Sequence, residues 1–260
     1  MRNEDLKISA CVIAGNEEDK IEQCLASLTW CDEIVVVDSF SKDRTVELSC
    51  KYTDRVYQHA WDGYIAQKNY IHSLARFPWI LMVDADEVVS QELRREIEEE
   101  IGKNPPEIVA YQFPRLVFYL GKWIRHGEWY PDTKLRLFRK DKGRTAGQEP
   151  HDHVEVDGKI KNLAAPLYHF TYDDVTDHIR TLNLFSQISA EHKYRAGERF
   201  RFIDLLFRPL WRFGRAYFFK CGFLDGMPGF LIAVLSMFGV FIKYAKLYEL
   251  CKNPPKTPDV

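Results

Sequence analysis

Three carboxylates stand within four positions, at Asp84, Asp86 and Glu87, directly after the apolar run Trp79-Ile-Leu-Met-Val83. Negative charges this close raise one another's pKa, so the segment needs positive partners to keep all three ionised. A divalent cation is one candidate, because Mg2+ and Mn2+ take carboxylate ligands and complete their shell with water and phosphate oxygens. The alternative is structural, with Asp84 capping the next helix and the other two carboxylates solvated.

Apolar runs alternate with helical patterns through the first hundred residues. The pattern predicts strands over residues 6–14, 32–39, 55–60 and 79–83, and helices over 17–28, 44–52, 66–75 and 90–101. Strands that are apolar throughout and alternate with helices are typical of a mostly parallel sheet with both faces covered. Ligands bind such sheets beyond the carboxyl ends of the strands.

Polar side chains follow three of these strands. Asn16 and Glu17 come after the first, Asp38 ends the second, and Asp84 and Asp86 end the fourth. We expect Asp84 and Asp86 to point the same way, because side chains of a strand repeat every second residue. The sequence therefore predicts a polar site at the carboxyl edge of the sheet.

The pattern changes after residue 107. Residues 108–124, 133–140 and 153–160 read as antiparallel strands, with a hairpin turn at Val156-Asp-Gly-Lys159. We expect them to form a second, smaller sheet that packs against the first. The predicted organisation is a domain over 1–175, with halves 1–107 and 108–175, followed by a helical region over 176–260.

Charge is distributed unevenly along the chain. The net charge of −2 gives no overall field that favours nucleic acid. Residues 193–220, however, hold eight Lys and Arg against two acidic residues, a charge of +6 that leaves −8 for the remainder. The six cysteines form no C-x-x-C pair, and the N-terminus lacks a signal-peptide pattern, so we expect a reducing, cytoplasmic setting.

The basic segment is also aromatic. Phe202 to Lys220 mixes arginines with large apolar residues, as in helices that lie in a lipid interface. Gly226 to Ile242 is uncharged but only 17 residues long and interrupted by Pro228, whereas a full span needs about 20. We expect peripheral, monotopic attachment to the inner face of a bacterial cytoplasmic membrane. A buried helical hairpin and a true transmembrane span are the alternatives.

The sequence argues against two nucleotide-binding classes. The first β–α turn, AGNEEDK, has one glycine and two carboxylates where a G-x-G-x-x-G turn would hold a pyrophosphate, which argues against a dinucleotide-binding dehydrogenase. The chain also contains no G-x-x-x-x-G-K-[ST] segment, which excludes P-loop NTPases.

Taken together, five segments resemble a known family: ACVIAGNEEDKIEQCLASLTWCDEIVVVDSFSKDRT, WDGYIAQKN, WILMVDADE, HGEWYPDTKLRLFRK and PHDHVEVDG. They are similar to the family-2 inverting glycosyltransferases of GT-A fold, and more closely to the branch that adds glucose to the inner core of bacterial lipopolysaccharide. The resemblance runs from about Lys7 to Lys246. It implies a Rossmann-like sheet, a UDP-sugar donor, Mg2+ or Mn2+, and a lipid-anchored saccharide acceptor.

The resemblance also implies roles for individual residues. It places five residues, which we call the donor-side residues, near the donor nucleotide. It also makes Asp84 and Asp86 the D-x-D motif, with Asp86 the more direct metal ligand. In the segment DSFSKDRT, Phe40 stands where the family usually has a small residue. The donor-side residues are Asn16, Glu17, Asp38, Lys68 and Asn69. Without the resemblance, Lys68 reads as a solvated helix residue and Asn69 as a turn former.

Inverting transfer needs a carboxylate that accepts the proton of the attacking hydroxyl from the side opposite the leaving group. Two downstream candidates are Asp152, in EPHDHVEV, and Asp132, in WYPDTKLRLF. We favour Asp152, although the resembling branch usually has Glu at that place. The structural alternatives are a strand-end residue for Asp152 and a plain Pro-Asp turn for Asp132.

Among His151, His153 and His169, we expect His169 to complete the metal shell; the alternative is a hydrogen-bonded core histidine. Arg136 and Arg139 alternate along KLRLFRK and either pair with the diphosphate or flank a strand.

Two other functions fit parts of the sequence. DADEV matches the D-x-D-x-[TV] pattern of haloacid dehalogenase-like phosphohydrolases, but three strands precede it, whereas that motif normally ends the first. A non-catalytic, membrane-associated sugar-binding protein would bind the donor without turnover.

Overall fold

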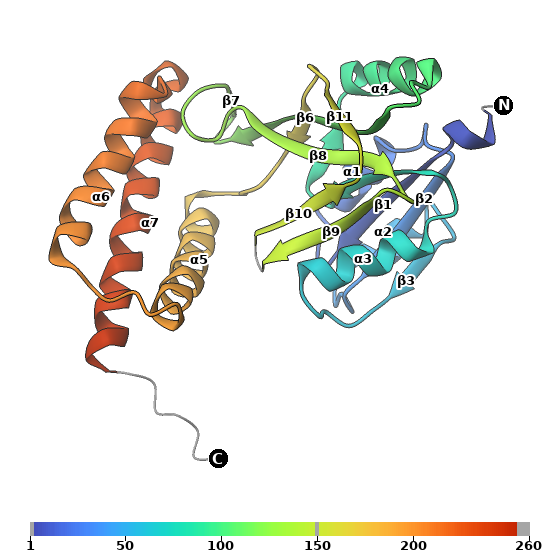
Figure 1. The fold of residues 1–260 in the computed structure, drawn as a ribbon. Coiled ribbons are helices and arrows are strands. Elements are labelled where there is room, and N and C mark those ends of the chain that lie inside the picture. Colours follow the sequence, from blue (N-terminus) through green and yellow to red (C-terminus); the bar gives the residue numbers. More distant parts are fainter. Residues whose placement is uncertain (1–2, 149–150, 254–260) are drawn as a thin grey trace, which may run out of the picture. The chain divides into compact units, whose positions relative to one another are not determined.

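The computed structural model describes residues 3–148 and 151–253 (Figure 1). The chain forms two compact units. Unit 1 comprises Met1–Leu116 and Asp132–His169, and unit 2 comprises Val117–Pro131 and Phe170–Val260. The domain boundaries expected from the sequence stay a prediction.

A parallel sheet forms the centre of unit 1, as predicted. Its strands β1 (Ile8–Ala14), β2 (Glu33–Asp38), β3 (Val56–Gln58) and β4 (Trp79–Asp84) lie in the order β3-β2-β1-β4. Every residue of β1 and β2 is buried, which explains their unbroken apolar sequence. Alternate residues of β1 enter two core clusters, with Val12 in one and Cys11 in the other. Both faces of the sheet are therefore covered.

The connecting helices of unit 1 are α1 (Ile21–Ala26), α2 (Thr45–Ser49), α3 (Tyr64–Leu74) and α4 (Gln91–Lys103), after a short 3-10 turn, η1 (Glu4–Leu6). Ser90, and not Asp84, caps α4, because the Ser90 hydroxyl oxygen accepts a hydrogen bond from the Leu93 amide at 3.0 Å. Its last turn ends at Asn104, which adopts a left-handed conformation.

The predicted small antiparallel sheet is present, but the segments 108–124 and 133–140 do not belong to it, so the expectation was wrong for these two. β8 (Asp132–Arg139) pairs antiparallel with β4, and β6 (Ile108–Tyr119) pairs with β8, which extends the central sheet. The physical reason is burial: Leu137 and Phe138 of β8 complete the two core clusters. The same sheet continues through β12 (Leu167–His169) to β5 (Glu87–Val89).

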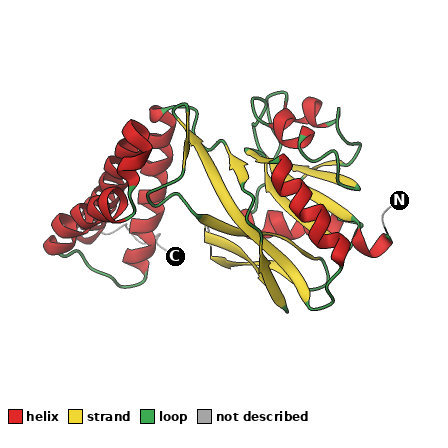
Figure 2. Ribbon diagram, turned by 90° about the horizontal axis from the view of Figure 1, so that it is seen from above, coloured by secondary structure: helices red, strands yellow, loops and turns green. Residues whose placement is uncertain are grey.

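The small antiparallel sheet contains two strands, β9 (Gly143–Gln148) and β10 (His151–Val156). The predicted hairpin at 156–159 is wrong, because β11 (Lys159–Asn162) leaves β10 and pairs in parallel with β6. Figure 2 shows the strands and helices from above.

Unit 2 is mostly helical. It contains α5 (Val175–Arg195), α6 (Phe202–Gly214), a π-helical turn η2 (Arg215–Phe219), a 3-10 turn η3 (Gly222–Asp225) and α7 (Gly226–Lys252), with β7 (Lys122–Ile124) beside the end of β6. The three long helices lie side by side in both views (Figures 1 and 2). Gly229 permits the first turn of α7 to pack against η3, because a Cβ there would lie 2.0 Å from the Gly222 carbonyl oxygen. By length and composition, the stretch Gly222–Lys252 could cross a membrane, and an 18-residue window within it has a mean hydropathy of 1.8.

Two buried carboxylates tie the segment 117–131 to the helices within unit 2. Asp225 accepts hydrogen bonds from the backbone amides of Arg125 (3.0 Å) and His126 (2.8 Å). Glu128 forms ion pairs with Arg212 (2.5 Å) and Arg215 (3.4 Å).

Candidate active site

The predicted polar edge of the sheet is confirmed by the strand register. Ala14 lies opposite Asp38, and Ile13 lies opposite Asp84, so β1, β2 and β4 end together. The turns after these three strands therefore carry their polar residues to one edge of unit 1.

The turn after β1 is fastened to the loop after β2. The Asn16 amide donates to the Ser41 hydroxyl oxygen (2.8 Å), and the Asn16 side-chain oxygen accepts from the Lys42 amide (2.9 Å). The Glu17 amide donates to the Thr45 hydroxyl oxygen (2.8 Å). Sequence reasoning missed Ser41 and Thr45 as structural parts of this turn, although Ser and Thr within DSFSKDRT are turn residues for this reason.

Asp38 stabilises the same loop through hydrogen bonds to its side chain. Its buried carboxylate accepts hydrogen bonds from the Ser41 amide (2.9 Å) and the Ser41 hydroxyl, with Gln58 at 3.4 Å. Phe40, between them, has a φ of 57° and an exposed side chain. A positive φ disfavours large side chains, which accounts for the small residue usual at this position in the resembling family.

The crowded carboxylates Asp84, Asp86 and Glu87 have cationic or potentially cationic partners in the protein itself. Asp84 pairs with Arg136, and its Oδ1 lies 3.7 Å from Lys68 Nζ. Asp86 lies 2.9 Å from His169 Nε2.

Glu87 completes the set. It is fully buried and contacts Arg136 (3.0 Å) and Arg115 (3.2 Å). Asp84 and Glu87 thus share Arg136, whereas Asp86 contacts His169.

The expectation that Asp84 and Asp86 point the same way assumed that both residues belong to one strand, and that assumption was wrong. β4 ends at Asp84, and Asp86 lies in the following turn. Burial disfavours the charged form of Asp84, but Arg136 and Lys68 outweigh it and hold the pKa of Asp84 well below its usual range. Asp84 is therefore ionised and locally compensated.

Lys68 links Asp84 to one of the two candidate bases. Its Nζ lies 2.8 Å from Asp152 Oδ2, so Asp152, on β10, belongs to the same polar cluster as the D-x-D. Asn69 acts on the backbone instead, because its amide exchanges two hydrogen bonds with the Thr145 main chain, at 2.8 and 3.0 Å. Asn69 thereby fixes β9 on α3 and keeps Lys68 beside β10.

The second candidate base, Asp132, is held by two cations. Arg115 contacts its Oδ2 at 2.7 Å and Lys134 its Oδ1 at 3.0 Å. Partial burial raises the pKa of Asp132, but these two cations outweigh it, and the pKa lies below its usual value. Asp132 joins the cluster through Arg115 and Glu87.

Sequence reasoning noted the charge of Glu87 but not its buried position between two arginines, and it did not single out Arg115. Besides its two arginines, Glu87 accepts a hydrogen bond from the Asp84 amide at 2.9 Å, so it fixes the backbone of the motif as well. The sequence did carry a signal for Arg115, a charged residue inside the apolar run AYQFPRLVFY.

The described residues fit a divalent cation only in part. Asp86 and His169 bring one carboxylate oxygen and one imidazole nitrogen within 2.9 Å of each other. This donor set suits Mn2+ better than Mg2+, because Mg2+ prefers oxygen ligands. The pairing of β12 with β5 brings them together, since His169 lies opposite Glu87. Within residues 3–148 and 151–253, no three His, Cys, Asp or Glu side chains form a metal-binding group, so further ligands must come from a bound molecule or water.

Of the remaining basic and imidazole candidates, only Arg136 belongs to the charged cluster among the described side chains. Arg136 enters the cluster, whereas Arg139 pairs with Asp141 at 3.3 Å. His153 is exposed and lies 3.6 Å from Glu155. The side chain of His151 lies outside the described residues.

Comparison with known proteins gives one family. Residues 9–156 match the model of Glycosyl transferase family 2. The lipopolysaccharide core biosynthesis glycosyltransferase LpsC of Rhizobium meliloti is 32% identical over 251 residues, which cover 94% of this chain and 93% of LpsC. The uncharacterized glycosyltransferase RT0209 of Rickettsia typhi is also 32% identical, with 94% and 87% covered.

Solved structures agree on the fold. S. aureus TarS in complex with UDP-GlcNAc aligns with a TM-score of 0.50 at 16% identity, covering 95% of this chain and 91% of that one. Glucosyl-3-phosphoglycerate synthase from Mycobacterium tuberculosis in complex with phosphoglyceric acid aligns with a TM-score of 0.50 at 13% identity, covering 74% and 80%. The predicted GT-A-type α/β fold is confirmed, and the family match argues against a phosphohydrolase.

Proposed function

The chain belongs to glycosyltransferase family 2, and we propose that it moves a hexose, with inversion, from a UDP-sugar to a membrane-borne saccharide such as the inner core of lipopolysaccharide. The observation that carries the proposal is the charged cluster at the carboxyl edge of the sheet, in a chain similar to LpsC over nearly its whole length. Glucose is the hexose that the resemblance favours. The UDP-GlcNAc complex of TarS supports a uridine-diphosphate donor.

The donor lies across the carboxyl edge in this proposal. Asn16, Glu17 and Asp38 hold the nucleotide, since their turn and loop are fastened to each other by side-chain hydrogen bonds. Lys68 and Arg136 provide the positive charge that a diphosphate requires. Both side chains are largely buried and already face carboxylates, so the diphosphate competes with Asp84 and Asp152 for them.

Asp86 and His169 would hold Mg2+ or Mn2+, with water and diphosphate oxygens completing the shell; Asp84, also expected as a ligand, contacts Arg136 and Lys68 instead. The cation would supply Lewis-acid stabilisation of the negative charge that develops on the departing diphosphate. The mutual approach of Asp86 and His169 supports this assignment.

Asp152 accepts the proton in the transfer step. The acceptor hydroxyl oxygen forms a bond to the anomeric carbon, the bond from that carbon to UDP breaks on the opposite side, and the hydroxyl proton passes to the carboxylate. Asp152 is favoured over Asp132 because its ion pair is with Lys68, which the donor diphosphate draws away. Asp132 keeps two cations and a lowered pKa, which makes it a weaker base.

The proposed location is cytoplasmic, peripheral on the inner face of the cytoplasmic membrane. A lipid-anchored acceptor favours an enzyme that stays at the membrane surface. The apolar stretch Gly222–Lys252 and the name of the LpsC relative are compatible with this location.

A screen of nucleotide sugars tests the proposal. A UDP-hexose with Mn2+ or Mg2+ should raise the thermal midpoint, since a ligand at about 100 times its Kd adds about 2.7 kcal/mol of stability. Asp86→Ala should remove the metal-dependent part of this shift, and should abolish sugar transfer with little change in the unliganded midpoint. Undiminished transfer in excess chelator would refute the metal role, and release of phosphate from a generic phosphoester without sugar transfer would refute the function.

A further inference from the structure

Helix α6 exposes an apolar face to solvent. Of its residues, all of which the structure describes, Pro209 alone is buried. Residues at positions 202, 206 and 210, and again at 203, 207 and 211, recur every four residues and therefore share one side of the helix. These six side chains are between 45% and 66% exposed: Phe202, Ile203, Leu206, Phe207, Leu210 and Trp211.

The exposed apolar surface continues beyond α6. Five more large side chains, in η2, η3 and the start of α7, are between 46% and 73% exposed: Phe218, Phe219, Phe223, Leu224 and Met227. We call these eleven residues the α6 face. Single exposed apolar residues are ordinary on a protein surface, but a run of this length marks an interaction site.

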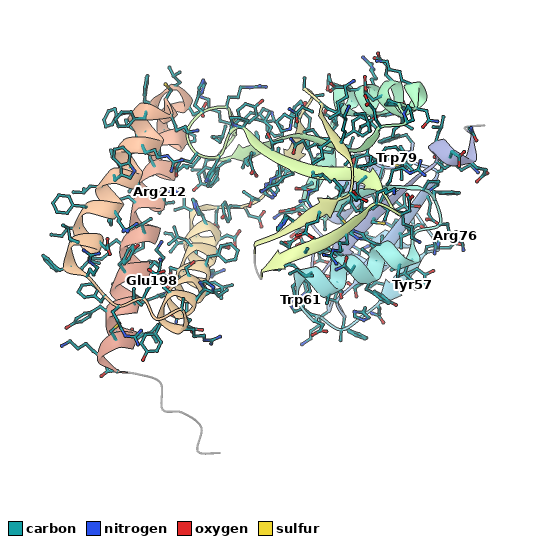
Figure 3. All side chains as sticks on the ribbon, viewed as in Figure 1. Tyr57, Trp61, Arg76, Trp79, Glu198 and Arg212 are labelled. Carbon is teal, nitrogen blue, oxygen red and sulfur yellow. The ribbon has the colours of Figure 1, made fainter. Side chains whose placement is uncertain are left out.

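Basic side chains accompany the α6 face. At about 100° per residue, the apolar residues span about half of the circumference of α6, and Arg208 and Arg212 lie on the other half, each in an ion pair. Arg212, labelled in Figure 3, lies in the last turn of α6 and is 41% exposed. Within residues 3–148 and 151–253, Arg201 and Lys220 form no ion pair.

We propose that the α6 face docks on a bilayer that contains anionic phospholipids. In this arrangement α6 lies in the membrane plane, its aromatic and aliphatic side chains enter the interface, and Arg201 and Lys220, at the start of α6 and the end of η2, contact headgroup phosphates. The inference rests on the proposed function, which supplies the membrane-borne acceptor, and deepens it by assigning the surface that meets the lipid.

Charge and length argue against other occupants. A symmetric dimer through this face would bring two copies of the same basic residues together, which is repulsive. α6 has 13 residues and is about 20 Å long, short of the roughly 30 Å of a bilayer core, so it cannot span one. A lipid surface accepts both the apolar face and its positive border.

Vesicle flotation tests the proposal with the full chain. Wild type should float with vesicles containing about a third phosphatidylglycerol at low salt, and much less with pure phosphatidylcholine. A Phe207→Glu/Trp211→Glu variant should bind at least tenfold more weakly. An Arg201→Gln/Lys220→Gln variant should lose about fivefold per residue on anionic vesicles. The matched control is Leu184→Glu/Phe185→Glu, which changes two similarly exposed apolar residues of α5 and should bind as wild type.

Transfer to a water-soluble acceptor fragment separates docking from catalysis. The α6 variant should keep wild-type transfer and thermal midpoint while losing flotation. Wild type that floats but transfers nothing would contradict the proposed function and leave the docking surface intact. The docking proposal is overturned if wild type stays with the soluble fraction, if the α5 control loses as much binding as the α6 variant, or if the α6 variant still floats and resists alkaline carbonate, which would indicate insertion through α7.

Discussion

A buried glutamate lies between two arginines in each unit, and the two sites differ in how far the arginines are exposed to solvent. Glu87 of unit 1 is fully buried, and its partners Arg136 and Arg115 are 9% and 19% exposed. Glu128 of unit 2 is 7% exposed, but Arg212 and Arg215 are 41% and 48% exposed. The same charge pattern thus faces inward in one unit and outward in the other.

In our proposal, this difference reflects the kind of ligand that each unit binds. In unit 1 the arginines continue to Asp84 and Asp132, so the charges close on one another and on the carboxyl edge. Exposed large apolar residues are few there, with Phe40, Trp61, Tyr64 and Ile160 the ones found among its described residues. In unit 2 the arginines are half-exposed and belong to α6 and η2, whose large apolar side chains are also exposed. Unit 1 holds a polar small molecule in our proposal, and unit 2 holds a surface.

The base assignment in unit 1 should give the largest effect. Asp152→Asn should lower kcat at saturating donor by about 10²–10⁴-fold, because it removes the proton acceptor. Asp132→Asn should stay within about tenfold of wild type. If instead Asp152→Asn keeps a near-normal kcat, Asp152 is not the base.

The two glutamates can be compared directly by substitution. Glu87→Gln should lower the free energy of unfolding by about 3–5 kcal/mol, because two largely buried arginines lose their shared counter-charge. Glu128→Gln should cost about 1–2 kcal/mol, since Arg212 and Arg215 can turn toward water. Urea unfolding of both variants measures the difference, and equal losses would remove the distinction drawn between the units.

A buried histidine of unit 1 should produce a smaller effect than the substitution of Glu87. Both ring nitrogens of His72 lack a hydrogen-bond partner among the described residues, and its ring packs edge-on against Phe138. Burial lowers the pKa of His72 to about 4. Between about pH 4 and 6.5 the unfolded chain therefore binds a proton that the folded chain does not, and stability falls as the pH falls.

The size of this effect is about 1.4 kcal/mol per pH unit below 6.5, or about 2 kcal/mol between pH 7 and pH 5. His72→Phe should flatten the profile by that amount in urea unfolding at the two pH values. His178 of unit 2, whose pKa burial also lowers to about 4, gives the matched comparison; its ring nitrogen bonds the Tyr119 hydroxyl at 2.9 Å. An unchanged slope in His72→Phe would show that His72 is not the source.

The parallel half of unit 1 could be predicted because its signals are local. Each strand is an unbroken apolar run, and each polar candidate directly follows one, so strand order alone brings Asp38 and Asp84 to one edge. The choice of His169 among the histidines had no such local support, and the pairing of β12 with β5 is what brings it beside Asp86.

The missed features depend on long-range pairing. Glu87 is buried because β5 pairs with β12, and Arg115 faces it because β6 pairs with β8, and no sequence spacing reveals either pairing. Likewise, nothing near Asn69 indicates that its amide bonds the Thr145 backbone, 76 positions away. The sequence pattern suggests a separate sheet for β8 because its pairing with β4 also joins distant segments.

Glu128 also sits close in the chain to a carboxylate of the other unit. Only Trp129, Tyr130 and Pro131 separate it from Asp132, which is anchored by Arg115. The covalent connection between the two units at this point is therefore three residues long, and an ion pair holds the residue at each end within its own unit.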